Sequence, residues 1–257
     1  MDIRAEAAKY YDLWPPAFKD VAFYADRIPS GNASVLELGC GTGRVLIPLA
    51  ESCAYVHGID VSEAMVDICR EKIAQAGLPW GRTSVAVGDI TRFDLGRQFD
   101  LIIAPYRVFQ NLETDEEIDG VFECVRKHLA SDGSSILNVF RPGSVDSMKQ
   151  KWGWGTEGEH FRWEVPLPSG RLTCHERRKN IDVGKFVLYP EAVYRKYEGD
   201  ALVEEAILRI CMRCYNPEQF EKLIVDHGYE IIGEWGGYDG EVYGEGNELV
   251  IQFRDST

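Results

Sequence analysis

The stretch Ser34-Val-Leu-Glu-Leu-Gly-Cys-Gly-Thr-Gly-Arg44 decides the fold of this chain. Residues 35–38 predict a buried strand, and the three glycines at every second position after it predict an open loop. Apolar residues then recur at helical spacing over residues 45–50, which predicts a helix. A strand, a glycine loop and a helix begin a doubly wound α/β nucleotide-binding unit, in which glycine permits positive φ and lets a ligand approach closely.

Glu37 and Arg44 narrow the choice of ligand. A dinucleotide-binding loop takes a small residue at its sixth position, and that position, counted from Gly39, is Arg44. Glu37 stands two residues before the loop, where its carboxylate repels a pyrophosphate but suits an ammonium group. S-adenosylmethionine, which carries an adenosine, an amino group and no phosphate, therefore fits this loop better than a dinucleotide.

The run from Val35 to Gly43 resembles the first motif of the class I S-adenosylmethionine-dependent methyltransferases. The apolar run, the acidic residue and the glycine spacing carry the resemblance together, and the alternative is a turn in another kind of α/β domain. The resemblance implies S-adenosyl-L-methionine as cofactor and S-adenosyl-L-homocysteine as product. It also implies that the motif contacts the cofactor through Glu37, Gly39, Cys40, Gly41 and Gly43.

A second strand over residues 55–59 ends at Asp60, about 20 residues after Gly39, where an acidic residue accepts hydrogen bonds from ribose hydroxyls. Ser62 looks like the N-cap of the next helix, which should end near Gly77. By the resemblance, Val61 lies in the cofactor site and Met65 packs on adenine, although Met65 is nearly as easily a core residue of that helix.

Asp89 and Ile90 follow a third strand over residues 84–87. The resemblance implies that Asp89 accepts a hydrogen bond from the adenine amino group and that the next backbone amide, of Ile90, reaches a ring nitrogen. The alternative for Asp89 is an ordinary helix or turn cap.

A fourth strand over residues 99–104 ends at Ala104, which we assign to the cofactor site. The loop over residues 105–111 should lie beside the transferred methyl group, because ligands bind beyond the carboxyl ends of the strands. Tyr106 is the catalytic candidate in this loop. Methyltransferases that act on exocyclic base amines carry Asn/Asp-Pro-Pro-Tyr here, and Ile103 and Ala104 replace its first two residues, which argues against base methylation.

The remaining core elements complete a doubly wound, Rossmann-like seven-stranded methyltransferase sheet over residues 1–143 and 216–257. A capping box predicts a helix that begins after Thr114, and Pro217 at the first helical position predicts another that begins after Asn216. A turn at residues 131–133 leads into a strand over 135–140, and two last strands are predicted over 229–235 and 249–253. The glycine-rich loop over 236–247 should be mobile or should cover something.

Residues 144–215 exceed what this fold needs, and they predict an inserted antiparallel β cap that binds substrate. Its strands are predicted over residues 160–165, 171–181, 186–189, 193–197 and 201–215. The aromatic run over residues 152–163 could form an aromatic wall for a cationic or flat substrate, or a small core for the cap. His160, inside this run, is the second catalytic candidate.

Residues 1–30 precede the first strand and contain Tyr10-Tyr11-Asp12-Leu13-Trp14. In the resembling methyltransferases such a Tyr-Asp segment folds over the cofactor as a lid. Tyr11 is then the expected contact, and the alternative is a helix packed on the edge of the domain.

Composition sets broader limits. The 257 residues carry a net charge of −14, so a nucleic acid would be repelled at long range. No apolar run is long enough for a membrane span, no signal peptide is visible, and the seven scattered cysteines suit reduced thiols, so we expect a cytoplasmic protein. No metal site is predicted, and the pair Cys211 and Cys214 is not expected to bind metal or to act in redox chemistry. The oligomeric state cannot be read from the sequence.

Together these features predict a methyltransferase that acts on nitrogen or oxygen of a small-molecule acceptor. Two alternatives remain open. A non-catalytic protein could use the same cofactor pocket as a sensor or assembly module, because methyl transfer requires no fixed catalytic residue. A nicotinamide-dependent oxidoreductase is the other, and Glu37 and Arg44 speak against it.

Overall fold

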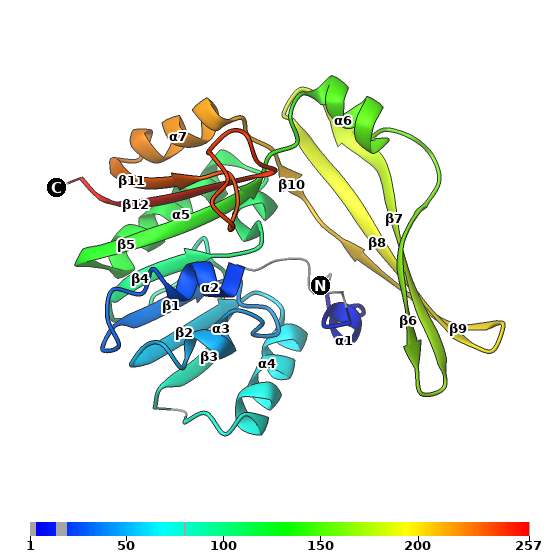
Figure 1. Cartoon of the computed structure of the whole chain (residues 1–257), viewed down its shortest axis with the longest axis horizontal. Helices are drawn as coiled ribbons and strands as arrows, with labels where there is room; N and C mark the ends of the chain where they lie inside the picture. The colour runs from blue at the N-terminus through cyan, green and yellow to red at the C-terminus, as the bar shows by residue number, and fades with distance from the viewer. Residues whose placement is uncertain (1–3, 14–19, 80, 257) are drawn as a thin grey trace.

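Seven strands form one mixed sheet, sheet A, in the order β11-β12-β5-β4-β1-β2-β3 (Figure 1). The structure is a computed structural model that describes residues 4–13, 20–79 and 81–256. The strands of sheet A are β1 (Ser34–Leu38), β2 (Tyr55–Asp60), β3 (Thr83–Val87), β4 (Phe99–Ala104), β5 (Leu129–Phe140), β11 (Tyr229–Trp235) and β12 (Glu248–Asp255). The strands β1 to β5 pair in parallel, and β12 pairs antiparallel with β5 and β11. The predicted doubly wound, seven-stranded fold is confirmed.

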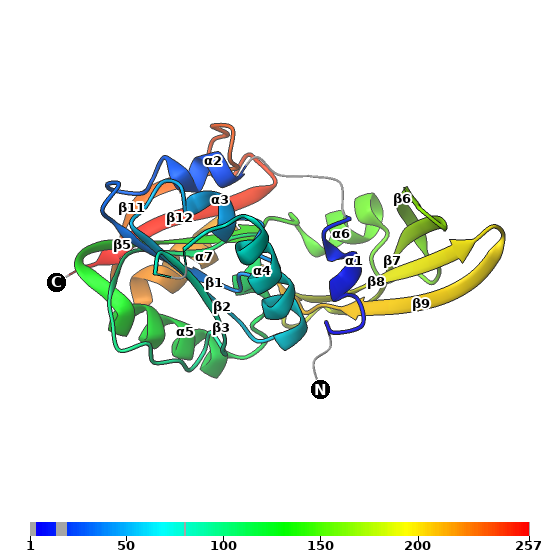
Figure 2. The same ribbon diagram turned by 90° about the horizontal axis from the view of Figure 1, so that it is seen from below.

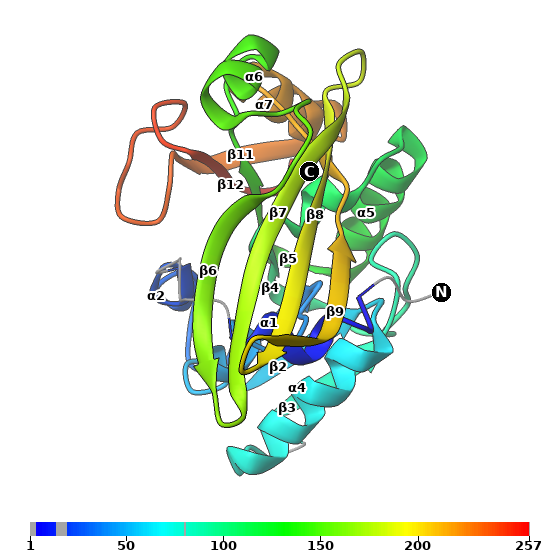
Figure 3. The same cartoon turned by 90° about the vertical axis from the view of Figure 1, so that its right-hand side faces the viewer.

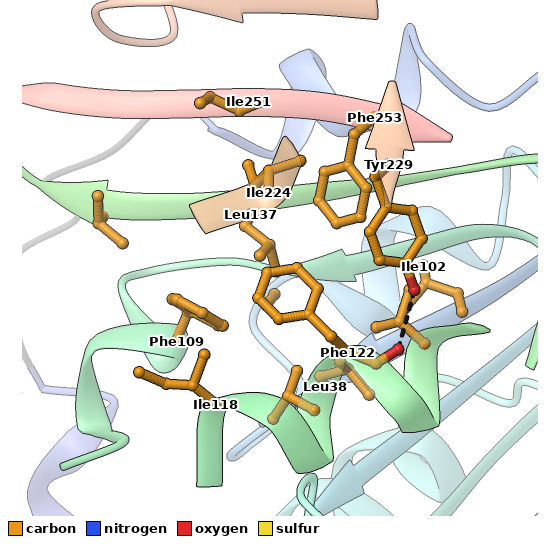
Figure 4. Close-up of a cluster of buried hydrophobic side chains, with 14 of the residues drawn as sticks. Leu38, Ile102, Phe109, Ile118, Phe122, Leu137, Ile224, Tyr229, Ile251 and Phe253 are labelled. Carbon is orange, nitrogen blue, oxygen red and sulfur yellow. Dashed lines mark hydrogen bonds between the residues drawn. The ribbon is translucent and has the colours of Figure 1, made fainter. Parts of the chain in front are cut away.

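Helices cover both faces of sheet A. On one face lie α5 (Asp115–His128) and α7 (Pro217–Asp226), and on the other lie α2 (Asp20–Ala25), α3 (Leu46–Leu49) and α4 (Glu63–Gln75). Figure 4 shows the first of these cores, where Phe122 of α5 packs beside Phe253 of β12. There the Tyr229 hydroxyl donates a hydrogen bond of 2.8 Å to the carbonyl of Phe122. The predicted capping box at Thr114 is present, Asn216 forms a second one at the start of α7, and Ser62 caps α4 as predicted.

The helix predicted after the glycine loop is present as α3, which has one turn only, because the chain turns back after Ala50 so that the amide of Ala54 donates to the carbonyl of Ala33 (2.9 Å). One local prediction in the core was wrong. The turn predicted at residues 131–133 lies inside β5, which already begins at Leu129. The register between β4 and β5 shifts there, so the extra residues are taken up as a bulge rather than as a turn.

Residues 160–213 form a second, antiparallel sheet, sheet B, beside the edge of sheet A where its parallel strands end (Figures 1 and 3). Its strands are β6 (His160–Leu167), β7 (Gly170–Asp182), β8 (Val187–Glu198), β9 (Ala201–Arg209) and the short β10 (Met212–Arg213). The order is β10-β8-β7-β6, with β9 also paired to β8. Helix α6 (Val145–Trp152) lies at one end of this sheet and was not predicted from the sequence.

Pro190 does not break the sheet, so the two strands predicted over residues 186–197 are one strand, β8. Arg178 and Lys179 of β7 together lie opposite Pro190, which forms a bulge where the missing N–H of proline is tolerated. The single strand predicted over residues 201–215 is instead divided into β9 and β10, because the amide of Ile210 donates to the Pro190 carbonyl at the break (3.1 Å).

The short helix α1 (Ala8–Tyr11) lies between the two sheets (Figures 1 and 2). Tyr10 stacks on Tyr194 of sheet B with ring centroids 5.8 Å apart, and Lys9 pairs with Glu204 at 2.5 Å. This segment therefore links sheet B to the core. Among the helices described, none is long and apolar enough to cross a membrane.

Candidate active site

A cavity of about 610 Å³ opens at the carboxyl ends of β1, β2 and β4, between sheet A and sheet B. The residues that line it come from the glycine loop, from the ends of these strands and from the facing strands of sheet B. Of the predicted cofactor residues, those that line this cavity are Tyr11, Glu37, Gly39, Cys40, Gly41, Asp60, Val61, Met65, Asp89 and Ile90. Residues from four separate segments of the chain thus meet in one cavity.

The glycine loop shapes the floor of this cavity. Gly39 has φ of 68°, and a Cβ atom there would lie 2.5 Å from the side chain of Val108, so no larger residue fits. Gly41 has φ of 52° and open space beside it, and its amide donates to Asp60 Oδ2 at 2.9 Å. The backbone at Gly41 is therefore exposed to a ligand, as a cofactor-binding loop requires.

Asp60 is buried at the end of β2, and backbone amides hold both of its oxygens. Oδ2 accepts from Gly41, and Oδ1 accepts from the amide of Ser62 at 2.9 Å. A carboxylate oxygen can accept more than one hydrogen bond, so each oxygen keeps a lone pair for a ligand hydroxyl. Arg4 lies 3.9 Å from Oδ1.

Glu37 is 3% exposed, and among the residues described in the structure its Oε2 has no hydrogen-bond partner. Burial raises the pKa of Glu37 well above its usual value, and Arg44 only partly opposes this. A buried carboxylate without a partner is costly, and a cationic or hydrogen-bonding ligand group would remove that cost.

Arg44 has a structural role that the sequence did not reveal. Its guanidinium makes two hydrogen bonds, of 2.6 and 2.7 Å, to the carboxylate of Asp20, which is completely buried in α2. It also lies 5.1 Å from the ring centroid of Tyr106. Arg44 thus joins α2 to the wall of the cavity, at the position where a dinucleotide loop needs a small residue.

At the other end of the cavity, Asp89 caps its own turn. Its Oδ1 accepts from the amide and the hydroxyl of Thr91 at 3.0 and 2.7 Å, and Arg92 lies 3.0 Å from Oδ2. Burial acts to raise the pKa of Asp89, but these partners outweigh it and lower the pKa. Met65 is buried and Val61 is exposed, so this end of the cavity has an apolar rim.

Contacts of Asp12 hold the N-terminal segment against the glycine loop. Asp12 accepts a hydrogen bond of 2.7 Å from the hydroxyl of Thr42 and pairs with Lys72 of α4 at 2.6 Å. Tyr11, beside it, lines the cavity. Residues 14–19 of the lid predicted over residues 1–30 lie outside the described residues, as do residues 1–3.

Three predicted residues are not brought into this cavity. Gly43 faces α4, where a Cβ atom would lie 2.6 Å from Cys69 Sγ, and Ala104 is buried at the end of β4. His160 does not line this cavity or the neighbouring one described below, and it lies near Gly153. The geometry therefore adds no support for direct contacts of Gly43 or Ala104 with the cofactor, or for a catalytic role of His160.

Tyr106 and Arg107, directly after β4, both adopt positive φ, of 55° and 67°. Such backbone is strained for residues other than glycine and collects at functional sites. A buried network holds it: Asn138 Oδ1 accepts from the Arg107 amide at 3.0 Å, Asn138 Nδ2 donates to Glu248 at 2.9 Å, and Glu248 forms a salt bridge with Arg107. Sequence reasoning missed Arg107, Asn138 and Glu248, because they lie far apart in the chain.

A second cavity of about 530 Å³ adjoins the first, and Tyr106 and Arg107 line both. Its walls include Trp152 and Trp154, the loop over residues 236–247, and sheet B. The aromatic run is therefore divided: Trp152 and Trp154 line this cavity, whereas Trp163 packs in the core of sheet B and Phe161 is exposed. Among the described residues, no group of three or more His, Cys, Asp or Glu side chains is arranged to hold a metal ion.

Comparison with known proteins agrees with this geometry. Residues 35–133 match the family described as a methyltransferase domain. This match covers the glycine loop, Asp60, Asp89 and the loop after β4. Residues 35–133 therefore form a methyltransferase domain, and the chain is a methyltransferase. Its cofactor is S-adenosyl-L-methionine, and S-adenosyl-L-homocysteine is the product.

Several relatives resemble the methyltransferase over most of its length. It is 28% identical over 207 residues to the dTDP-3-amino-3,6-dideoxy-alpha-D-glucopyranose N,N-dimethyltransferase of Streptomyces fradiae, which covers 70% of this chain and 78% of the relative. The structure of the CcbJ methyltransferase from Streptomyces caelestis matches with a TM-score of 0.78 and 23% identity over 100% of this chain and 99% of that one. CalS10, an amino pentose methyltransferase from Micromonospora echinaspora, matches with a TM-score of 0.70 and 22% identity over 96% and 95% of the two chains. These structural matches establish the fold.

Proposed function

We propose that this methyltransferase transfers a methyl group to the amine nitrogen of a small organic acceptor bound in the second cavity. The observation that carries the proposal is the position of Tyr106, which lines both cavities on a strained turn after β4. A cofactor in the first cavity and an acceptor in the second would meet at this residue. A volume of about 530 Å³ is in the range of small-molecule sites.

The first cavity suits S-adenosylmethionine residue by residue. Glu37 offers a buried carboxylate oxygen without a described partner to the amino group, and Asp60 offers its remaining lone pairs to the ribose hydroxyls. Asp89 and Ile90 line the end of the cavity proposed for adenine, beside Met65. Tyr11, held nearby by the contacts of Asp12, closes the cavity as a lid residue.

The division of labour follows the two sheets. The chain over residues 1–143 and 216–257 holds the cofactor, and residues 144–215 select the acceptor. In support, the predicted cofactor residues that line the first cavity all precede residue 110. The second cavity, in contrast, takes walls from α6, β6, β7 and β8. The loop over residues 236–247 adds a further wall through Tyr238 and Asp239.

When bound, S-adenosylmethionine supplies a methyl group on a positively charged sulfur, and the lone pair of the acceptor takes this group while the C–S bond electrons return to sulfur. The protein's main task is alignment, which can contribute about 7–11 kcal/mol. Burial raises the pKa of Tyr106, while Arg107 and Arg44 oppose the shift. Tyr106 therefore stays a neutral phenol at pH 7, able to orient the acceptor by hydrogen bonding but not poised as a base.

Nitrogen is favoured over oxygen by the relatives. The curated relative from Streptomyces fradiae and a second one from Saccharopolyspora spinosa are both named as N,N-dimethyltransferases of amino sugars. A neutral amine also carries a nucleophilic lone pair without a strong base, which agrees with a neutral Tyr106 beside the donor.

The test is a transfer assay with methyl-labelled S-adenosylmethionine and a panel of small primary and secondary amines, each paired with the hydroxyl analogue. We expect label in one or more amines, and loss of at least about ten-fold in rate for Asp60→Ala, the scale for a hydrogen bond to a charged group. Tyr106→Phe separates orientation by the hydroxyl from packing by the ring. Tight cofactor binding with no transfer to any amine, or transfer to hydroxyl analogues alone, would contradict the proposal.

A further inference from the structure

Two arginines of sheet B share one carboxylate on the wall of the second cavity. Arg178 Nη2 donates to Glu176 Oε2 at 2.6 Å, and Arg162 Nε lies 3.5 Å from the same oxygen. All three side chains line the cavity, and Arg162 and Glu176 also line the cofactor cavity. The cluster therefore stands where the two cavities join.

This cluster carries one positive charge in excess. Over residues 4–13, 20–79 and 81–256, neither arginine has a second carboxylate within ion-pair distance. Arg178 is only 9% exposed, and its Nε lacks a hydrogen-bond partner in the same part of the chain. Its other bond, of 2.5 Å from Nη1, goes to the carbonyl of Trp152, which is neutral. An anionic oxygen of a ligand would satisfy a buried guanidinium that lines a cavity and still has an N–H group to donate.

The backbone places both arginines specifically. Arg162 is the extra residue of a bulge in β6, between the pairs Phe161 with His175 and Trp163 with Cys174. Arg178 lies in the bulge of β7 opposite Pro190. Bulges redirect side chains and are frequent beside active sites, so two bulges that bring arginines to one carboxylate are a built feature rather than a random surface pair.

The other charged groups of the cavity leave this excess in place. Arg107 is matched by its own partner, Glu248, in the buried network behind the strained turn. Asp239 and Glu241 belong to exposed residues of the loop over 236–247, and Glu241 accepts from the Asp239 amide at 3.0 Å. The wall on sheet B thus carries two arginines and one carboxylate, whereas Asp239 and Glu241 lie on the exposed loop.

We propose that the acceptor carries an anionic oxygen group, a carboxylate or a phosphate, that binds Arg162 and Arg178. The apolar part of the acceptor then packs on Trp152 and Trp154, and the atom to be methylated reaches Tyr106. This inference rests on the proposed function, because it assigns the second cavity to the acceptor. Arg162 and Arg178 are specificity residues, and Glu176 aligns them and competes with the ligand.

The test uses acetate and inorganic phosphate as probes on the full-length protein saturated with S-adenosylhomocysteine, at constant ionic strength. Tryptophan fluorescence reports binding, since Trp152 and Trp154 line the same cavity. The variants are Arg162→Gln, Arg178→Gln and Glu176→Gln. Arg171→Gln is the matched control, because Arg171 lies on β7, pairs with Glu164 and lines neither cavity.

We expect saturable binding of at least one probe, weakened about ten-fold in Arg162→Gln or Arg178→Gln, the scale for one charge-assisted hydrogen bond. Glu176→Gln should bind the probe more tightly, because a competing carboxylate is lost, and Arg171→Gln should be unchanged. Binding of acetate alone identifies a carboxylate site, and binding of phosphate alone identifies a phosphate site.

Binding that is absent for both probes, or equal in the arginine variants and the control, would overturn the inference. If Arg178→Gln fails to fold, Arg162→Gln and Glu176→Gln still give opposite expected shifts. The affinity for S-adenosylhomocysteine is measured in parallel. If the unaltered protein does not bind it, the proposed function fails as well, whereas normal binding without an anion site leaves the proposed function standing.

Discussion

The cofactor cavity and the acceptor cavity are adjacent, but the chain builds them in different ways. The cofactor cavity takes many of its polar groups from the ends of parallel strands, such as Glu37 near the end of β1 and Asp60 at the end of β2. The acceptor cavity takes its walls from residues as distant as Trp152, Arg178 and Glu248. The strand-end groups of the first are a local property of the sequence, whereas the second exists only after sheet B has packed beside sheet A.

The same contrast appears in how charge is held. In the cofactor cavity the carboxylate of Glu37 is buried with an oxygen that lacks a described partner, so it is prepared for a cation. In the acceptor cavity the excess charge is positive, on the exposed Arg162 and the buried Arg178 beside Glu176. The proposals thus assign ligand groups of opposite charge to the two halves of the site.

The largest expected effect tests whether sheet B has a hydrophobic core of its own. Trp163 is 9% exposed and packs against Tyr194, with ring centroids 6.0 Å apart, in a cluster that includes Tyr10 of α1. Trp163→Ala should lower the free energy of unfolding by about 3–5 kcal/mol, the range for large aromatic truncations. Urea denaturation measures this change. A loss below about 1 kcal/mol would mean that Trp163 is not a core residue.

The second effect is on cofactor affinity alone. Asp60→Ala should weaken binding of S-adenosylhomocysteine by about 1.5–3 kcal/mol, because the ribose loses a charged acceptor. Calorimetry measures the change, and Asp60→Asn, which keeps one acceptor oxygen, should lose less. Unchanged affinity in a folded Asp60→Ala protein would show that the ribose does not bind at the end of β2.

The third effect depends on pH. Burial raises the pKa of Glu37, so the folded, ligand-free protein holds a proton there at pH values where the unfolded chain has released it. Stability is then greatest below the ordinary value of 4.5 and falls as pH rises toward the folded value. Glu37→Gln should remove this fall, so denaturation midpoints of the variant should exceed those of the parent most at the alkaline end.

Glu37→Gln should also weaken S-adenosylmethionine binding about ten-fold, the scale for one charge-assisted hydrogen bond. Methylthioadenosine, which lacks the amino acid part, is the matched ligand and should bind almost as before. Equal losses for the two ligands would give Glu37 a purely structural role.

The smallest expected effect is that of a substitution in the acceptor cavity on cofactor affinity. Trp152→Ala should change S-adenosylhomocysteine affinity by no more than about 0.5 kcal/mol, the scale of substitutions remote from a site. It should nevertheless raise the Michaelis constant of the acceptor. Trp154→Ala is a less clean test, because Trp154 also packs in the core cluster of Met148 and Leu188. Lost cofactor affinity in folded Trp152→Ala would contradict the division between the two cavities.

Sequence reasoning reached the strands of sheet A, and ten of the twelve predicted cofactor residues line the cofactor cavity, because glycine spacing, strand ends and caps are local signals. The capping box at Thr114 and the proline after Asn216 placed two helices correctly for the same reason. The Arg44–Asp20 pair and the Arg107–Asn138–Glu248 network were missed, since nothing local marks a contact between segments far apart in the chain.

Sheet B shows where local signals mislead. Pro190 normally ends a strand, and the sequence therefore predicted two strands where β8 is continuous. A bulge in the neighbouring strand β7 accommodates the proline, and this pairing depends on register rather than on composition. The same bulge carries Arg178 to the cavity, so the feature that defeated the prediction is part of the proposed acceptor site.

The most direct test of the account is one calorimetric comparison on the unaltered protein. S-adenosylhomocysteine and NAD are titrated separately, and Asp60→Ala serves as the reference for specific binding. The account predicts one site for S-adenosylhomocysteine, weakened in Asp60→Ala, and no binding of NAD, because Glu37 repels a pyrophosphate and Arg44, bound to Asp20, stands where a dinucleotide-binding loop needs a small residue. Tight binding of NAD with none of S-adenosylhomocysteine would contradict it.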